Sequence, residues 1–429
     1  MPIRWSSIHE QLGETPRDLD FAMLRAAVDA KLTETESLDW KKALPAKGEE
    51  PAREFAKDVA AMANTRGGLI VYGVEEESGT AAAKAFASID NSDTAQRRLR
   101  QLAANGIHPM VPGLQCLPLE SDDGTDKVLV LAVPRSADAP HVIGVRDRLG
   151  LPFRDGAGTG WLREREIERA YAERFAGRQA QSQRLAEMIN ETAAMLDMER
   201  SAWLVGVCRP RTPLPAVADP LAASAVRTVL ETVLRRTSEM FTAPSQERFQ
   251  LIREVGNEGL NPRTGLRRWV VRIPTTHDTD MRSMFVHIEL HHDGSAVLAA
   301  QVHGWGREEP EPGVHKVLCP VVESFAADFA ALSETYASHL GGQVPMAYQC
   351  ELLKPEDLPL QVLDLHRLSG GIALGGYQPV PGSWTLRQLV PVNGEFPIDA
   401  DAADVRAAAR AIALDIVNQF GVPRLHLFE

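Results

Sequence analysis

A helix, a tight turn and an apolar strand follow one another directly near the start of this sequence, and they limit the folds open to the chain. Across residues 49–64, apolar side chains recur at helical spacing, with Pro51 and two glutamates at the beginning, where a helix tolerates both. Gly67 and Gly68 end the helix, because glycine enters left-handed backbone conformations without steric cost. The continuous apolar run at 69–74 then predicts a strand, so this segment packs a helix on a sheet.

The surrounding residues extend this segment into one α+β domain at 21–176, after an N-terminal extension of residues 1–20. Further helices are predicted at 94–104 and 163–175, and strands at 113–120, 127–133 and 152–154. An Asp-Gly pair at 123–124, between two apolar runs, predicts a hairpin.

A polar helical stretch at 177–200 predicts a linker to a second α+β domain at 201–429. In that domain, helices are predicted at 221–240, 321–340 and 402–420, and strands at 267–273, 284–291, 296–302 and 346–352. The predicted fold class is α+β, with an N-terminal α/β domain and a second α+β domain of unknown role.

The charge of the chain is acidic and unevenly spread. The 429 residues include 46 Lys and Arg against 58 Asp and Glu, a formal net charge of −12. This balance argues against a histone-like coat or a polybasic membrane binder, but it leaves room for one basic face. Residues 1–180 hold 24 cationic and 28 anionic side chains, so most of the excess lies beyond them. Any nucleic-acid surface must therefore be a local groove.

Cysteine usage and the apolar runs indicate the compartment. The cysteines lie at positions 116, 208, 319 and 350, form no C-x-x-C pair and suit a reducing environment. The first residues lack the apolar core of a signal peptide, and the longest apolar runs fall far short of the roughly 18 residues of a membrane helix. We therefore expect a cytoplasmic protein with no membrane partner.

Four sequence blocks occur in the order of one known family. They are E-T-E-S-L-D-W-K at 34–41, A-N-T-R-G-G-L-I-V-Y-G-V-E at 63–75, V-P-R-S with a later P-H at 133–141, and F-R-D-G with a later Thr and Leu at 153–162. Together they resemble the Schlafen-type AlbA-like domain, which is found in bacterial regulators and in vertebrate Schlafen proteins. The resemblance covers residues 30–175, and the rest of the chain resembles no family that we can name.

The resemblance implies a nucleic-acid-binding module and, in the nuclease members of the family, metal-dependent cleavage of RNA. In those members, acidic residues of the same blocks bind the metal. The matching positions here are Glu34, Asp39 and Glu75, or Glu76 beside it. Carboxylate oxygens are the ligands that Mg²⁺ and Mn²⁺ favour, so one of these ions is the implied cofactor if the protein is a nuclease. No cofactor is implied otherwise.

Two departures bear on this acidic triad. The family usually has Glu where this chain has Asp39, and often Asp where it has Glu75, which moves each carboxylate by about one methylene. In addition, Glu34 and Asp39 are five residues apart, so an extended strand would point them to opposite faces. Both can be ligands only if the chain bends between them.

Two further groups of residues are singled out. The cations best placed for phosphate contact are Lys41, Lys42, Arg97, Arg98, Arg100 and Arg154. The three arginines at 97, 98 and 100 cannot share one helix face, because positions i, i+1 and i+3 fan out. The second group is expected to hold a turn and allow close backbone packing rather than touch a ligand, and it consists of Asn64, Gly67, Gly68 and Gly73.

Other kinds of chemistry lack support. The sequence has no G-x-x-x-x-G-K-[ST], H-E-x-x-H or G-x-S-x-G motif, which argues against a P-loop, a zinc peptidase and an α/β-hydrolase. His287 and His291 share one face of the strand predicted at 284–291. They would lie about 13 Å apart at 3.3 Å per residue, too far to share a metal ion. We interpret them as part of a polar strand face.

Three functions stay open on this basis. The first is a DNA- or RNA-binding regulatory protein whose C-terminal domain senses a signal, dimerises or recruits a partner. The second is a metal-dependent endoribonuclease that uses Glu34, Asp39 and Glu75. The third is a protein-interaction scaffold. Schlafen cores pair two such lobes in one chain, so a single lobe suggests, by analogy, a homodimer.

Overall fold

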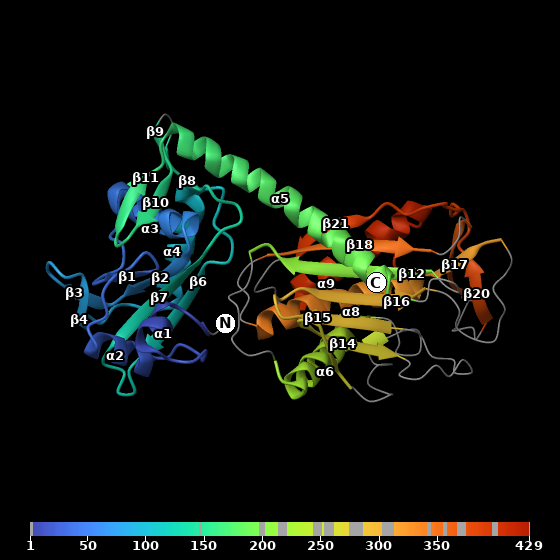
Figure 1. The fold of residues 1–429 in the computed structure, drawn as a ribbon, viewed down its shortest axis with the longest axis horizontal. Helices are drawn as coiled ribbons and strands as arrows, with labels where there is room; N and C mark the ends of the chain where they lie inside the picture. Colours follow the sequence, from blue (N-terminus) through green and yellow to red (C-terminus); the bar gives the residue numbers. More distant parts are fainter. Residues whose placement is uncertain are drawn as a thin grey trace. The chain divides into compact units, whose positions relative to one another are not determined.

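The structure is a computed structural model, and it divides into two compact units, Met1–Ala180 and Gln181–Glu429 (Figure 1). It describes residues 3–145, 148–196, 202–212, 221–242, 251–252, 261–273, 286–302, 313–340, 345–354, 358–366, 375–396 and 402–428. Both units combine helices with sheets, so the predicted α+β class is confirmed. No helix in these ranges has the length and apolarity needed to cross a membrane.

A four-stranded sheet forms the centre of the first unit. Its strands, in spatial order, are β1 (Leu38–Lys41), β2 (Gly67–Tyr72), β7 (Lys127–Pro134) and β6 (Gln115–Glu120). β1 and β2 are parallel, because the helix α3 (Glu49–Asn64) crosses back between them. β2, β7 and β6 pair in antiparallel fashion, and β6 and β7 form the hairpin that the Asp-Gly pair predicts.

Helices cover both faces of this sheet. On one face, α3 and α4 (Asp93–Gly106) bury apolar side chains such as Phe55 and Leu99 against Ile70 of β2. On the other face, α1 (Ser7–Leu12) and α2 (Phe21–Asp29) pack against Trp40 of β1. Residues predicted as an N-terminal extension thus contribute to the core, since Ile8 is fully buried there.

Short strands surround this sheet. They are β3 (Val74–Glu77), β4 (Ala82–Phe86), β5 (Ile107–His108), β8 (Val142–Val145), β9 (Arg148–Gly150), β10 (Pro152–Asp155) and β11 (Gly158–Trp161). β10 and β11 form a hairpin that contacts α3. This contact brings polar residues of the hairpin close to the helix.

One helix, α5 (Glu164–Ala193), replaces the two segments predicted at 163–175 and 177–200. The single glycine at 177 does not break it, because an isolated glycine costs a helix only about 1 kcal/mol. In the second unit, Leu185 and Ile189 of this helix are buried against Val205 and Val297 of the sheet. The predicted linker is therefore partly a packed element.

An antiparallel seven-stranded sheet organises the second unit. Its order is β13 (Arg263–Gly265), β14 (Arg268–Ile273), β15 (Val286–His291), β16 (Ala296–Gln301), β12 (Trp203–Pro210), β18 (Met346–Leu353) and β21 (Val392–Phe396). The other elements are α6 (Ala223–Met240), β17 (His315–Leu318), α8 (Cys319–His339), β19 (Leu360–His366), β20 (Gly375–Pro379), α9 (Ala402–Val417) and η2 (Asn418–Phe420). Apolar residues of α6, α8 and α9 form one core with this sheet.

The strand predicted at 284–291 begins at Val286 in the structure, and residues 284 and 285 lie outside the described residues. Its polar face is buried, because His287 and Glu289 are 2% and 1% exposed. The two oxygens of Glu289 lie 2.8 Å from Nε2 of His287 and 2.8 Å from Nε2 of His291. The two histidines therefore share a carboxylate, and the face is a buried hydrogen-bonded network.

The glycines between α3 and β2 allow the close packing of this region. Gly67 has φ +75°, and a Cβ there would lie 2.5 Å from the backbone nitrogen of Arg135. A Cβ on Gly68 would lie 2.5 Å from the carbonyl oxygen of Ser37. Gly73 has φ +97°, and its Cβ would lie 3.0 Å from the carbonyl oxygen of Lys127. Side chains at these positions would push strands apart.

We predict that Gly67→Ala lowers the free energy of unfolding by roughly 2–5 kcal/mol, from backbone strain together with the clash. The matched control is Gly79→Ala, because Gly79 has φ +88° and no atom within 4 Å of a built Cβ. It is expected to lose about 1 kcal/mol from strain alone. Urea unfolding of the full chain, followed by circular dichroism, measures both. Equal losses would contradict the packing argument.

Candidate functional site

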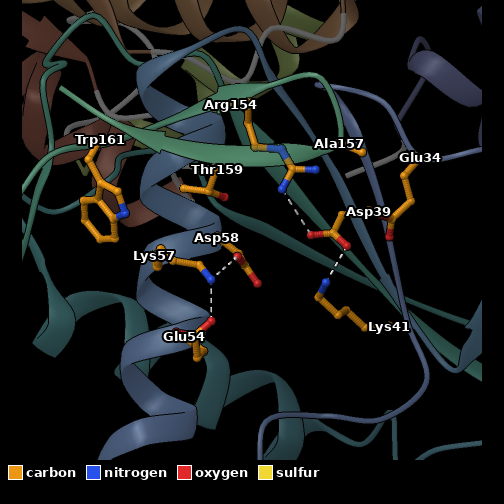
Figure 2. Close-up of a pocket in the computed structure, with 10 residues that line it drawn as sticks. All are labelled: Glu34, Asp39, Lys41, Glu54, Lys57, Asp58, Arg154, Ala157, Thr159 and Trp161. Carbon is orange, nitrogen blue, oxygen red and sulfur yellow. Dashed lines mark hydrogen bonds and ion pairs between the residues drawn. The ribbon is translucent and has the colours of Figure 1, made fainter. Parts of the chain in front are cut away.

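A cleft of about 470 Å³ opens in the first unit beside β1, α3 and the β10–β11 hairpin (Figure 2). Its lining residues are Glu34, Asp39, Lys41, Glu54, Lys57, Asp58, Arg154, Ala157, Thr159 and Trp161. Four carboxyl groups and three cationic groups thus share one cavity. Such a concentration of opposite charges in a cleft is typical of a functional site.

Local structure brings these side chains together. Glu54, Lys57 and Asp58 lie at positions i, i+3 and i+4 of α3, so they share one helix face. Asn64, at the end of α3, donates from Nδ2 to the carbonyl oxygens of His141 (3.0 Å) and Pro152 (2.8 Å). This side chain therefore holds the start of β10 next to the helix.

A tight turn places Glu34 on the same side as Asp39. Thr35 and Leu38 form an isolated antiparallel bridge, and the backbone nitrogen of Thr35 donates to the carbonyl oxygen of Leu38 at 3.0 Å. The chain thus reverses between the two acids and is not extended there. The bend that two shared ligands would require is present.

Asp39 is the most deeply buried charge of the cleft, with 2% of its side chain exposed. Its Oδ1 accepts a hydrogen bond of 2.5 Å from Nζ of Lys41, and its Oδ2 lies 3.5 Å from Nη1 of Arg154. Arg154 is also buried and donates from Nη2 to the carbonyl oxygen of Thr35 at 3.2 Å. The carboxylate and guanidinium together connect β1, the preceding turn and β10.

Glu34 lies in an environment that disfavours its charge. Burial, together with a hydrogen bond to and repulsion from Asp39, raises the pKa of Glu34 to about 8. The backbone N–H of Trp40 donates to Oε1 of Glu34 at 2.9 Å and only partly opposes this shift. At pH 7 Glu34 is therefore mostly protonated and neutral.

The acidic residues of α3 complete the charge pattern. Burial and the charge of Asp39 raise the pKa of Asp58 as well. Lys57 Nζ lies 3.6 Å from Asp58 Oδ1 and also pairs with Glu54. Each cation in the cleft therefore has a carboxylate partner.

Glu75 lies outside the cleft, on β3. Its Oε1 pairs with Nζ of Lys42 at 3.2 Å, and neither residue lines the cavity. Glu76, the neighbouring candidate, is exposed on the same strand. The structure therefore brings Glu34 and Asp39 together but does not bring either candidate for the third acid to them.

These residues do not fit the metal site that the resemblance implies. Within the described ranges, no three His, Cys, Asp or Glu side chains are grouped so that they could hold a metal ion. Both oxygens of Asp39 are already paired with Lys41 and Arg154, and Glu34 favours its neutral form. Mg²⁺ is usually held by one or two carboxylates together with water, and a carboxylate serves this purpose only when it is ionised and has an oxygen free to coordinate.

The predicted phosphate-binding cations separate into two sets. Lys41 and Arg154 line the cleft, whereas Lys42 and the three arginines of α4 do not. Arg97 donates to the carbonyl oxygen of Asp93 at 3.3 Å, Arg98 donates to that of Ala46 at 2.7 Å, and Arg100 is exposed. Their assignment to phosphate contact stays a prediction.

The sequence did not identify four residues that line the cleft and carry charged or aromatic side chains: Glu54, Lys57 and Asp58 of α3 and Trp161 of β11. The sequence could have indicated the three helix residues, because their spacing places three charges on one side of a helix whose other side is apolar. No sequence pattern identifies Trp161, since only the folded hairpin places it at the cleft.

We predict that Asp39→Asn lowers the free energy of unfolding by about 3–5 kcal/mol, because it leaves the buried guanidinium of Arg154 without a counter-charge. Glu75→Gln is the control, since it breaks an exposed pair of the same domain and should change stability little. Chemical unfolding of both variants measures these two changes in the free energy of unfolding. If the two losses are alike, the buried pair does not hold the site together.

Comparison with known proteins supports the resemblance found in the sequence. Residues 34–163 match the family model described as Schlafen, AlbA_2, and no curated protein matches the chain. A crystal structure of the DIP2311 protein from Corynebacterium diphtheriae is 22% identical over 33% of this chain and 26% of that chain, with a TM-score of 0.22. This match spans about a quarter of that protein. All residues that line the cleft lie within 34–163, and this part of the chain is a Schlafen AlbA_2 domain.

Proposed function

We propose that this protein binds nucleic acid through the cleft of its first unit and acts as a regulator. The observation behind the proposal is that the family match contains the whole lining of a cleft with three cationic side chains. In this proposal the second unit senses a signal or recruits a partner. A homodimer would place two such clefts on one nucleic acid.

Lys41 and Lys57 are the groups best suited to phosphate. Their side chains are 38% and 22% exposed, whereas that of Arg154 is only 3% exposed. Both lysines have carboxylate partners with which a phosphate must compete. Arg154 is better suited to positioning Asp39. We therefore expect moderate affinity that weakens steeply as salt rises.

The protonated, neutral form of Glu34 favours the binding of an anionic ligand. With Glu34 protonated near pH 7, the lining carries one negative charge fewer beside its three cations. If all four acids were ionised, the cleft would have an excess negative charge that repels phosphate. The raised pKa thus removes one barrier to binding at neutral pH.

A metal-dependent endoribonuclease has less support, because the described residues do not assemble the acidic triad. We therefore propose no cleavage step. A scaffold that binds no nucleic acid is the remaining alternative, and a direct binding measurement distinguishes it.

The first test is fluorescence anisotropy with a short labelled oligonucleotide at salt concentrations from 50 to 200 mM. We expect Lys41→Gln and Lys57→Gln each to weaken binding roughly tenfold and to reduce the salt slope by about one. Lys42→Gln is the matched control, because it removes a cation next to Lys41 that lies outside the cleft.

The same oligonucleotide, incubated with Mn²⁺ or with EDTA, is then run on a denaturing gel. Intact oligonucleotide in both lanes is expected. Metal-dependent shortening that Glu34→Ala abolishes would establish the nuclease alternative. No binding by the unaltered protein at low salt would leave only the scaffold.

The pKa of Glu34 predicts that affinity depends on pH. As pH rises from 7 to 9, Glu34 loses its proton beside Asp39, and affinity should fall several-fold. The proton on Glu34 also stabilises the fold. Because the pKa of Glu34 in the fold exceeds its ordinary value of 4.5, this contribution to the free energy of unfolding is complete below about pH 4.5 and is lost as pH rises through about 8.

Glu34→Gln should keep high affinity across this pH range, since its amide stays neutral. Glu75→Gln, outside the cleft, should keep the pH dependence of the original protein. Anisotropy titrations at half-unit steps of pH measure both. A pH dependence that persists in Glu34→Gln would show that another group is responsible.

A further inference from the structure

Trp161 is an aromatic side chain at the cleft whose exposure contrasts with that of the rings in the central sheet of its domain. It is 45% exposed, whereas Trp40 and Tyr72 are 1% and 3% exposed. It shares the cleft with Lys57 and Thr159, and Figure 2 shows its ring beside α3 near Lys57. A half-exposed tryptophan has a large apolar surface to offer a ligand.

The ring of Trp161 rests against backbone. A Cβ built on Gly150 of β9 would lie 2.4 Å from Cζ3 and 2.9 Å from Cε3 of Trp161, so only glycine leaves room for the ring at this distance. The backbone nitrogen of Leu162 donates to the carbonyl oxygen of Leu151 at 2.9 Å and fixes the strand beside it. The ring is therefore held in place before any ligand arrives, which lowers the entropic cost of stacking.

The ion pairs of the cleft limit the affinity that phosphate contacts can give, so stacking on an aromatic ring would add to it. Lys41 and Arg154 pair with Asp39, and Lys57 pairs with Glu54 and Asp58. A phosphate must displace these partners, so phosphate contacts alone give limited affinity. Stacking on an aromatic ring needs no free charge and supplies affinity for any base.

We propose that Trp161 is a stacking platform for an unpaired nucleobase, so that the nucleic acid bound in the cleft is single-stranded there. This inference rests on the proposed function and names its substrate class. A volume of about 470 Å³ falls within the size range of pockets for small ligands. In a duplex the base faces are already stacked on one another and cannot reach the ring.

The test compares Trp161→Ala and Trp161→Phe with the unaltered full chain, using a labelled single strand and the duplex of the same sequence. The unaltered protein should bind the single strand more tightly. Trp161→Ala should weaken single-strand binding about ten- to a hundredfold, and Trp161→Phe should keep most of the affinity because a ring remains. Phe175→Ala is the matched control, since Phe175 is also an exposed aromatic residue but does not line the cleft.

Two further readouts separate stacking from a structural effect. The salt slope of Trp161→Ala should equal that of the unaltered protein, because no phosphate contact is lost. A set of single strands with one abasic site should include a position that weakens the unaltered protein but not Trp161→Ala.

The outcomes separate this inference from the function on which it rests. If the unaltered protein binds neither strand nor duplex, the proposed function fails. If it binds both equally and Trp161→Ala binds as well, the stacking proposal fails while nucleic-acid binding stands. Equal losses in Trp161→Ala and Trp161→Phe, or a changed salt slope, would also overturn stacking.

Discussion

The buried carboxylate of Asp39 determines both the shape and the chemistry of the cleft. Moving a carboxylate away from water is costly, and here Lys41 and Arg154 offset the cost from two sides. Through Arg154 the same charge fixes the turn at Thr35 and the strand β10. Burial raises the pKa of Glu34 and of Asp58, and the negative charge of Asp39 raises both further, so this residue also influences the protonation of the cleft.

Much of the local structure could be predicted because its signals are local. The helix at 49–64 has the predicted bounds, and the Asp-Gly pair forms the turn between β6 and β7. The long helix α5 was divided wrongly, since the change in polarity near residue 177 reflects a change of surroundings along one helix. The strand with His287 and Glu289 was predicted as polar, but its burial depends on packing that the strand does not encode.

The site was less predictable, because its geometry depends on contacts between distant segments. The motif identified Glu34 and Asp39, and a two-residue turn resolves the apparent conflict in their spacing. For the third acid, the sequence offered Glu75, three residues beyond β2, but the cleft instead contains Asp58 of α3. The choice between them depends on which face of the sheet α3 covers and on where β3 turns away.

The net charge of −12 and the charges of the cleft lead to one conclusion about recognition. A chain with excess negative charge cannot attract a nucleic acid through a broad positive field, and within the cleft each cation is already paired. Specific binding must then come from contacts that act at short range. Three features of the cleft can make such short-range contacts: the protonated Glu34, the displaceable ion pairs of two lysines and the fixed indole ring. None of them needs long-range attraction. In the binding that we propose, the ligand is selected by the fit of its unpaired base and adjoining phosphate rather than by its total charge.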